Sequence, residues 1–515
     1  MVDQLFRRKP AKAPPVEGPG LRRALGPVQL TLLGIGAIIG TGIFVLTGTA
    51  AAGGPGHLGA GPGLTLSFVF TGVACGLAAL CYAEFASMMP VAGSAYAYAY
   101  ASFGELVAWI IGWDLILEYG VGNVAVAIGW SGYFQGLLAG AGVHLPAWLG
   151  MDPLTALRSA PAVLAAAPHV FGLPIVLNLP AVAVTGAVTV LLCVGISESA
   201  RVNAAFVGLK LVMIAVFLYV GLQHVEPGNW TPFAPNGWDG MLTGAALIFF
   251  AYIGFDAVST TAEEAKNPQR DLPVGIIASL VVCTVLYVAV TAVLTGMVPV
   301  AALANAEPVA AALRTVGAHR VAGFISAGAV LSMVSVLLVM QLGQTRIFYA
   351  MSRDGLLSGR FSRIHPRFRT PVLPTVLTGC AVALAAGLID ISAAAELTNI
   401  GTLFAFILVS GGVWWLRVRE PERPRGFRVP ALPLVSTGAM ATCAYLMMGL
   451  PRVTWERFGL WLVVGLALYF AYGMRNSRLH AQPTPVPAAA EPVPGVAALP
   501  ARTPRLPEDP GFLSR

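Results

Sequence analysis

Four ionisable side chains lie within long apolar segments of this 515-residue chain: Asp114, Glu118, Lys210 and Asp256. Charged groups at membrane depth are costly, and those that are kept usually serve a function. Asp114 and Glu118 stand four residues apart in IIGWDLILEYG, so they share one face of a helix. A buried carboxylate can bind and release a proton, and Glu118 is the better candidate because it lies nearer the middle of its segment. These side chains therefore predict proton exchange.

Lys210 allows two readings. It lies about nine residues into its apolar segment, roughly 13 Å along a helix, which is too deep to reach the surface easily. Its ammonium group can bond backbone carbonyls and, if burial favours its neutral form, exchange a proton. The alternative is a structural lysine that locks helices together permanently.

Two interrupted helices could position such groups. The apolar stretch LGIGAIIGTGIF (33–44) contains four glycines, and each glycine inside a helix costs roughly 1 kcal/mol relative to alanine. A second apolar run, LIFFAYIGFDAVSTTAEE, is interrupted at Tyr252–Gly254, five apolar segments later. Matched breaks in two halves of a membrane protein point to a central binding site. For either segment taken alone, the glycines could instead allow close packing of unbroken helices through small residues.

The composition places these helices in a membrane. The chain is 57% hydrophobic and 11% charged, with a mean hydropathy of +0.76, whereas a soluble domain carries about 25% charged residues. Twelve apolar runs of spanning length are centred near residues 38, 75, 120, 185, 212, 250, 285, 335, 382, 406, 442 and 465. We expect an all-α polytopic membrane protein whose first span directs insertion, with no removable signal peptide.

The basic residues predict the orientation. Of the 31 Lys and Arg residues, few would lie on the side opposite the termini if all twelve runs cross: Arg158, Arg314, Arg320, Arg452 and Arg457. Basic residues near span ends are retained on the cytoplasmic side, so both termini are expected inside. The net charge of +7 then reflects a basic face beside anionic membrane lipid, not nucleic-acid binding.

The matched breaks divide the chain into expected parts. They are a cytoplasmic N-terminal segment (1–25), a first inverted repeat of spans one to five (26–223), a second of spans six to ten (239–416), two extra C-terminal helices (434–475) and a disordered cytoplasmic tail (480–515). This is a LeuT-like five-plus-five inverted repeat with helices one and six broken.

Four motifs in this order resemble the amino acid–polyamine–organocation superfamily, and most of all the bacterial members of its cationic amino acid transporter family. They are GIGAIIGTGIF, AEFASMMPVAGSAYAYAYASFGE (83–105), FAYIGFDAVSTTAEEAKNPQRDLP (250–273) and GQTRIFYAMSRDGLL (343–357). The resemblance covers most of residues 25–475. Eukaryotic members of that family often carry fourteen spans, against twelve counted here. The resemblance implies a carrier of L-amino acids in the plasma membrane, here a bacterial inner membrane.

The resemblance also implies a substrate site built from backbone. Free N–H groups around Gly40, Thr41 and Gly42 would bind the substrate carboxylate, and the positive end of a half-helix suits that anion. Carbonyls near Ile38, Phe250, Ala251 and Ile253 would bind the α-ammonium group. Phe250 and Tyr252 are candidates for an aromatic gate, or are simply core residues.

Further roles follow from the same resemblance. Lys210 resembles the lysine that replaces sodium in sodium-independent relatives, and Glu118 resembles a third-span glutamate of proton-coupled carriers. Glu84 belongs to a gate-like motif with Pro90 and Gly93, the alternative being a solvated helix end. Asp256 follows the second break and either orients the unwound backbone or pairs with a neighbour. A hydrogen-bonded structural acid and a residue with a role in transport are equally good interpretations of Asp256.

The sequence therefore predicts a proton-coupled, sodium-independent importer of L-amino acids that works by alternating access. An amino acid exchanger without proton coupling is the nearest alternative, and a non-transporting amino acid sensor is another. An ion channel would need a continuous polar pore. No segment holds a nucleophile–base pair or a metal cluster, so neither an enzyme nor a cofactor or metal is expected. Cationic and small neutral substrates both remain open.

Overall fold

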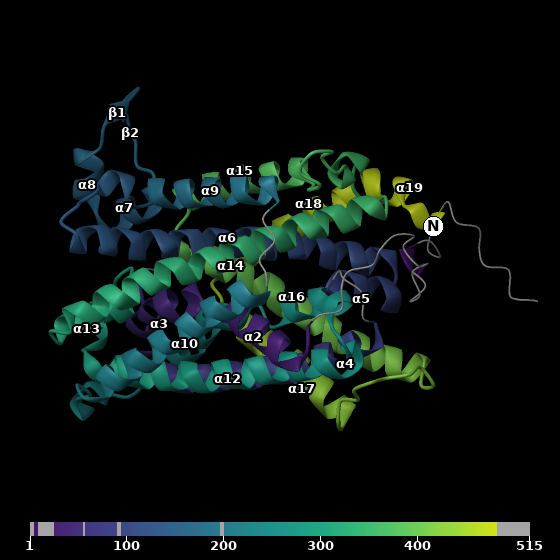
Figure 1. Cartoon of the computed structure of the whole chain (residues 1–515), viewed down its shortest axis with the longest axis horizontal. Helices are drawn as coiled ribbons and strands as arrows, with labels where there is room; N and C mark the ends of the chain where they lie inside the picture. Colours follow the sequence, from purple (N-terminus) through teal and green to yellow (C-terminus); the bar gives the residue numbers. More distant parts are fainter. Residues whose placement is uncertain (1–4, 9–24, 55–56, 90–93, 196–199, 481–515) are drawn as a thin grey trace, which may run out of the picture.

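The computed structural model describes residues 5–8, 25–54, 57–89, 94–195 and 200–480. Within them the chain is mostly helical, and Figure 1 shows long helices running side by side across the view. Most of the N-terminal segment, the motif residues Pro90 and Gly93, and the tail from 481 onward lie outside the described residues. The expectations for those parts are therefore not addressed by the structure.

Eight helical runs within the described residues are long and apolar enough to cross a membrane. Their main helices are α4 (Leu64–Met88), α6 (Glu105–Gly140), α10 (Ala200–Leu222), α11 (Gly237–Ile248), α12 (Pro268–Met297), α14 (His319–Arg353), α16 (Ile391–Arg419) and α18 (Arg452–Leu468). A ninth is formed if α2 (Pro27–Ile38) and the bent continuation η1 (Gly42–Leu46) with α3 (Thr47–Ala52) are one span. The expectation of a mostly helical, multi-pass membrane protein is confirmed.

Three shorter apolar helices complete the long elements: α9 (Leu179–Val194), α15 (Val372–Leu388) and α17 (Leu432–Met448). A helix lies at each of the twelve apolar centres predicted from the sequence. Side chains that accept from backbone N–H groups begin several helices, as at Asp152, Asn178 and Asp390. Proline in the first turn, as at Pro27 and Pro268, suits the same position because its missing N–H has no acceptor there.

The remaining elements are short. The α-helices are α5 (Ser94–Ser102), α7 (Pro153–Ser159), α8 (Pro161–Ala166), α13 (Pro308–Thr315) and α19 (Met474–Asn476). The 3-10 helices are η2 (Gly61–Gly63), η3 (Ala147–Leu149), η4 (Pro227–Trp230), η5 (Phe249–Tyr252), η6 (Asp256–Glu264), η7 (Val300–Leu303), η8 (Gly359–Ser362) and η10 (Arg478–His480), while η1 and η9 (Tyr469–Gly473) are π-helical.

A small antiparallel hairpin departs from the all-helical expectation. Strands β1 (His169–Val170) and β2 (Leu173–Pro174) pair at the same end of the molecule as α7 and α8 (Figure 1). Phe171 and Gly172 between them both have positive φ, at 51° and 80°. Such two-residue turns match the twist of the strands they join, and the hydropathy pattern used above does not detect them.

The first break is narrower than the glycine pattern predicts. Helix α2 continues through Gly34 and Gly36, ends at Ile38, and is followed by η1 and α3 at an angle of 42°. Gly34 lies against Ser279 of α12, and Gly36 lies against Val207 of α10, where a Cβ would overlap the neighbour. These two glycines serve close helix packing, and the break itself lies at Ile39–Gly40.

The second break follows α11. The chain continues as η5, unwinds over Ile253–Phe255 and resumes as the 3-10 helix η6. Gly254 has φ of +119°, a conformation that side chains with a Cβ rarely adopt. A Cβ there would also lie 3.0 Å from the backbone of Ala37. The second break thus packs directly on the end of α2.

Candidate functional site

The two breaks meet backbone to backbone. Gly42 of the first lies so close to Ala251 of the second that an added Cβ would overlap the Ala251 backbone. Together with the approach of Gly254 to Ala37, this contact brings the predicted binding segments into one buried region. All seven residues predicted to bind substrate are buried there: Ile38, Gly40, Thr41, Gly42, Phe250, Ala251 and Ile253.

The restart of the first helix can bind an anion. The first N–H groups of a helix have no acceptor within it, and the positive end of the backbone dipole lies at the same place. Thr41 stands at the N-cap position of η1, and its hydroxyl is buried without a hydrogen-bond partner among the described residues. Gly129 of α6 faces Thr41 and leaves room for it.

Tyr287 of α12 connects the carbonyls of both breaks. Its hydroxyl oxygen lies 2.9 Å from Ile38 O and 2.9 Å from Ala251 O, and its side chain is fully buried. A phenol has one hydrogen, so it donates to one of these carbonyls at a time. Sequence reasoning missed Tyr287 because it lies in an unbroken apolar helix and far from either glycine motif. Only the packing of α12 against α2 identifies it.

Lys210 of α10 binds the end of the first half-helix. Its ammonium Nζ donates to Gly36 O at 2.6 Å and to Ile39 O at 2.9 Å, and the side chain is fully buried. Carbonyls at a helix end lose their intrahelical donors, so the ammonium group supplies donors that the break removes. The structure therefore places Lys210 at the first break, together with the predicted binding residues.

The acidic residues lie on neighbouring elements. Asp114 and Glu118 of α6 both face α16: Asp114 Oδ1 lies against Gly401, and Glu118 lies beside Thr402. Both Asp114 oxygens are buried with no hydrogen-bond partner among the described residues. An unpaired buried carboxylate is costly when charged.

Asp256 is tied to the unwound segment that precedes it. Its carboxylate interacts with backbone groups of Gly254 and Ala257 and with the Tyr119 hydroxyl. The hydroxyl of Ser259 donates to Asp256 O at 2.6 Å. These contacts hold the backbone of the second break. They favour the interpretation that Asp256 orients the unwound backbone. Asp256 nevertheless lies close enough to Glu118 for their charges to interact.

Glu84 of α4 is buried rather than solvated, so the solvated helix-end alternative is wrong. Arg417 and Arg425 both form ion pairs with its carboxylate, the Arg425 Nε–Oε1 distance being 3.2 Å. The backbone N–H of Val429 donates to the same carboxylate at 2.8 Å. Glu84 thus holds the loop between α16 and α17 against α4.

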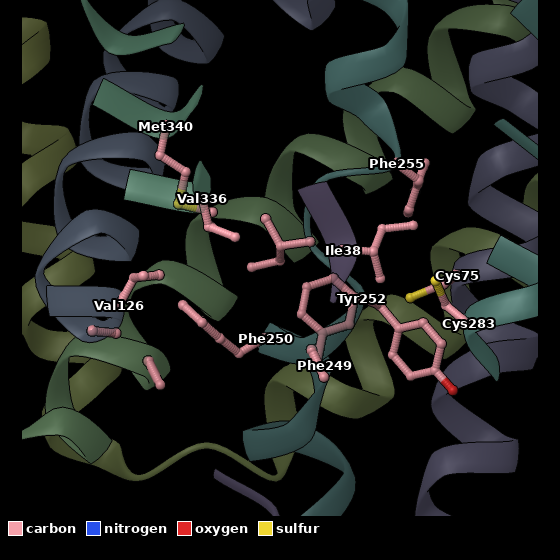
Figure 2. Packing of buried hydrophobic residues seen from close by; sticks show 14 of the residues in the cluster. Ile38, Cys75, Val126, Phe249, Phe250, Tyr252, Phe255, Cys283, Val336 and Met340 are labelled. Atoms are coloured by element: carbon pink, nitrogen blue, oxygen red, sulfur yellow. The ribbon is translucent and has the colours of Figure 1, made fainter. Parts of the chain in front are cut away.

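The two aromatic gate candidates, Phe250 and Tyr252, lie on different sides of the second break. In Figure 2, Phe250 lies on the side of Val126, whereas Tyr252 lies on the side of Cys75 and Cys283. The Tyr252 hydroxyl donates to Phe68 O at 2.7 Å, which fixes it in the interface with α4. Phe250 alone therefore borders the region next to the breaks where α6 and α14 contribute apolar side chains.

A cavity of about 350 Å³ lies beyond the first break, on the side away from Glu84. It is lined by Val45 of η1 and Gly129 of α6, and its far wall includes Arg158, which pairs with Asp390 at 3.8 Å. Gly129 in its lining also contacts Thr41 at the first break. Among the described residues, no group of three or more His, Cys, Asp or Glu could hold a metal ion.

Comparison with known proteins adds independent information. A family model described as amino acid permease matches residues 25–469. The chain is 50% identical over 461 residues to the branched-chain amino acid permease BcaP of Bacillus subtilis, covering 89% of this chain and 95% of that protein. It is 47% identical to the methylthioribose transporter of the same organism, covering 93% and 100%. Identity is 40% to the chloroplastic cationic amino acid transporter 9 of Arabidopsis thaliana, covering 79% and 68%.

Proposed function

Since the chain belongs to the amino acid permease family, we propose that it is a proton-coupled, sodium-independent importer of L-amino acids that works by alternating access. The observation that carries the coupling proposal is the pair of hydrogen bonds from Lys210 to Gly36 O and Ile39 O. The Lys210 ammonium group at the carbonyls of the broken helix repels a sodium ion. Because its hydrogen bonds hold Gly36 O and Ile39 O, a change in its protonation would change the geometry of the break.

The proposed architecture has twelve spans. The three shorter apolar helices would cross together with the eight longer runs and the bent pair. Spans one to five (26–223) and six to ten (239–416) form the inverted repeats, the helices in 434–475 are added, and both termini are cytoplasmic. The breaks in the first and sixth spans, which contact each other at Gly42 and Ala251, support this arrangement.

In the proposed mode of binding, the N–H groups around Gly40–Gly42 bind the substrate carboxylate. The α-ammonium group of the substrate binds the carbonyls of Ile38 and Ala251. One of these carbonyls lacks a donor whenever the Tyr287 hydroxyl donates to the other. An ammonium group brings three donors, so it satisfies the carbonyl that Tyr287 leaves open. Recognition of the amino acid backbone then engages both breaks at once.

The side-chain pocket is proposed to take a branched aliphatic substrate. Val126, Val336, Met340 and Phe250 surround the region next to the breaks (Figure 2), and all four are buried and apolar. Glu118 lies eight residues before Val126, about 12 Å along α6. A cationic side chain would meet no counter-charge among these four residues. The 50% identity to a branched-chain amino acid permease agrees with this choice.

Uptake by the purified protein in proteoliposomes tests coupling. An inward proton gradient should drive accumulation of L-leucine or L-valine, and a sodium gradient of equal size should have no effect. Accumulation that requires sodium would overturn the role of Lys210. Exchange that proceeds without any proton gradient, and no net accumulation with one, would identify an exchanger.

Competition against labelled leucine tests the substrate. Valine and isoleucine should compete, whereas arginine and lysine should compete at least tenfold less well. The relative that is 47% identical is named as a methylthioribose transporter. Methylthioribose has neither a carboxylate nor an α-ammonium group, so it should not compete. Stronger competition by arginine would reject the apolar pocket, and competition by methylthioribose would reject backbone recognition.

A further inference from the structure

An apolar groove follows the outer side of α12. It encloses about 520 Å³ and is formed on one side by α12 and on the other by Gly426 and Phe427 of the loop that follows α16. Its floor consists of Pro273, Val274, Ile277, Ala278, Val281 and Val282. Figure 1 shows α12 along the edge of the helix bundle, so its outer side would face the hydrocarbon of a bilayer.

The groove has the length of one membrane leaflet. From Gln269 to Val282 it extends along α12 for about 20 Å, at 1.5 Å per residue. A bilayer with its headgroup regions is about 40–45 Å thick, so one leaflet contributes about 20 Å. A single acyl chain that enters at the end of α12 next to Gln269 therefore spans the groove.

The mouth of the groove is basic. Arg270 lines it and is exposed, and no carboxylate among the described residues pairs with Arg270. Lys266 before it and Arg428, two residues after Gly426, are also exposed. An exposed cation at the end of an apolar groove, with two more cations close to the lining residues in sequence, matches a phospholipid with negative charge. Basic pockets on the cytoplasmic side of membrane helices bind such headgroups.

We propose that an anionic phospholipid of the cytoplasmic leaflet binds in this groove, with one acyl chain along α12 and its phosphate beside Arg270. The occupied groove joins α12 to the loop that holds Glu84. Phe427 in its wall is hydrogen-bonded to Ser87 through its N–H at 3.1 Å, and the neighbouring Arg425 and Val429 contact Glu84. The lipid therefore stabilises the loop in the position that covers α4. The choice of leaflet and this consequence for transport rest on the proposed orientation and function, whereas lipid binding in the groove does not.

Two matched tryptophan substitutions test the groove. Val281 and Val285 are one turn apart on α12 and both face outward, with 55% and 64% of their surface exposed. Only Val281 lines the groove. Val281→Trp should fill it and Val285→Trp should not, and neither buries a polar group or opens a cavity. Arg270→Gln removes the charge at the mouth.

The measurement is retention of lipid by the delipidated full-length protein, by native mass spectrometry after incubation with phosphatidylglycerol or phosphatidylcholine of equal chain length. The wild type should retain at least fivefold more phosphatidylglycerol. Val281→Trp should lose bound lipid of both kinds, Arg270→Gln should lose the preference, and Val285→Trp should match the wild type. Equal retention of the two lipids by the wild type, or equal retention by the two tryptophan variants, would overturn the proposal.

Uptake in proteoliposomes with and without phosphatidylglycerol tests the consequence for the loop. Phosphatidylglycerol should change the uptake rate of the wild type and of Val285→Trp, but not that of Val281→Trp. If none of the three proteins transports amino acids, the proposed function fails while the lipid retention stands. If all transport with the same lipid dependence, the link to the loop is wrong.

Discussion

Tyr287 and Lys210 are two buried side chains from other helices that donate hydrogen bonds to carbonyls of the first break. Tyr287 contacts Ile38 O and Ala251 O, and Lys210 contacts Gly36 O and Ile39 O. A carbonyl left buried without a donor costs roughly 1–3 kcal/mol. Each side chain therefore supplies a donor to carbonyls that the break leaves without one.

Replacing Tyr287 by Phe should weaken substrate binding more than it weakens the fold. The variant keeps the ring but removes the donor from both breaks, and we expect at least a fivefold rise in the substrate KM for uptake. The matched control is Tyr252→Phe. Tyr252 is equally buried and lies 5.5 Å from Tyr287 between ring centroids, but its hydroxyl bonds Phe68 O outside the breaks. Equal changes in KM would mean that Tyr287 has only a structural role.

Substitutions at Glu118 and Lys210 should separate coupling from binding. Glu118→Gln and Lys210→Ala are expected to abolish accumulation driven by a proton gradient, because the sequence predicts proton exchange at Glu118 and the proposed function assigns coupling to Lys210. Counterflow of leucine between equal pools needs no net proton movement and should persist in Glu118→Gln. Gradient-driven uptake at the normal rate in either variant would show that the coupling proposal is wrong for that residue.

At the scale of elements, the contact between the breaks depends on glycine. Gly42 meets the Ala251 backbone, which cannot move like the end of a flexible side chain. Overpacking typically costs about 1–3 kcal/mol, and here it would push the two half-helices apart. The short π-helix η1 and the 3-10 helices η5 and η6 are the irregular turns through which the chain enters and leaves this contact.

We therefore expect Gly42→Ala to reduce leucine uptake more than tenfold while the protein still inserts and remains monodisperse in detergent. Gly76→Ala in α4 is the control, because a Cβ at Gly76 meets no atom within 4 Å. That substitution should leave uptake unchanged and should raise the thermal stability slightly through helix propensity. Normal uptake by Gly42→Ala would show that the breaks do not need to touch.

At the scale of the whole molecule, one end is closed by charge and the other contains a cavity. Glu84 with Arg417 and Arg425 connects α4 to the loop after α16, while the cavity of about 350 Å³ lies beyond the breaks on the opposite side. Burial lowers the pKa of Arg425, and the charge of Glu84 opposes this shift. In the proposed function, this ion-paired group is a closure that would have to open during transport.

Removing the charge of Glu84 should open this end. Breaking a buried ion pair typically costs about 3–5 kcal/mol, so Glu84→Gln should favour the state open toward the cytoplasm. Cys81, fully buried near Glu84 and Arg417, is a natural reporter, and its maleimide labelling should become at least fivefold faster by peptide mass spectrometry. The wild-type protein, labelled under the same conditions, gives the reference rate.

The control for this experiment is Glu456→Gln, which removes an exposed pair with Arg452. Exposed pairs contribute about 0–1 kcal/mol, so Cys81 labelling should stay at the wild-type rate. Unchanged labelling in Glu84→Gln would mean that the loop stays in place without the ion pair.

The sequence by itself determined the class of protein, the twelve apolar helices and the positions of both breaks, because hydropathy and glycine act locally along the chain. It also singled out Lys210 and Glu118 as candidates, since an ionisable group in an apolar segment is conspicuous wherever its partner lies, and Glu84 through its motif. Only the tertiary structure separated Gly42, which touches the other break, from Gly34 and Gly36, which pack on neighbouring helices. It alone identified Tyr287, Arg425 and the groove along α12, because their roles arise from contacts between residues far apart in sequence, and no local pattern records which helix lies beside which.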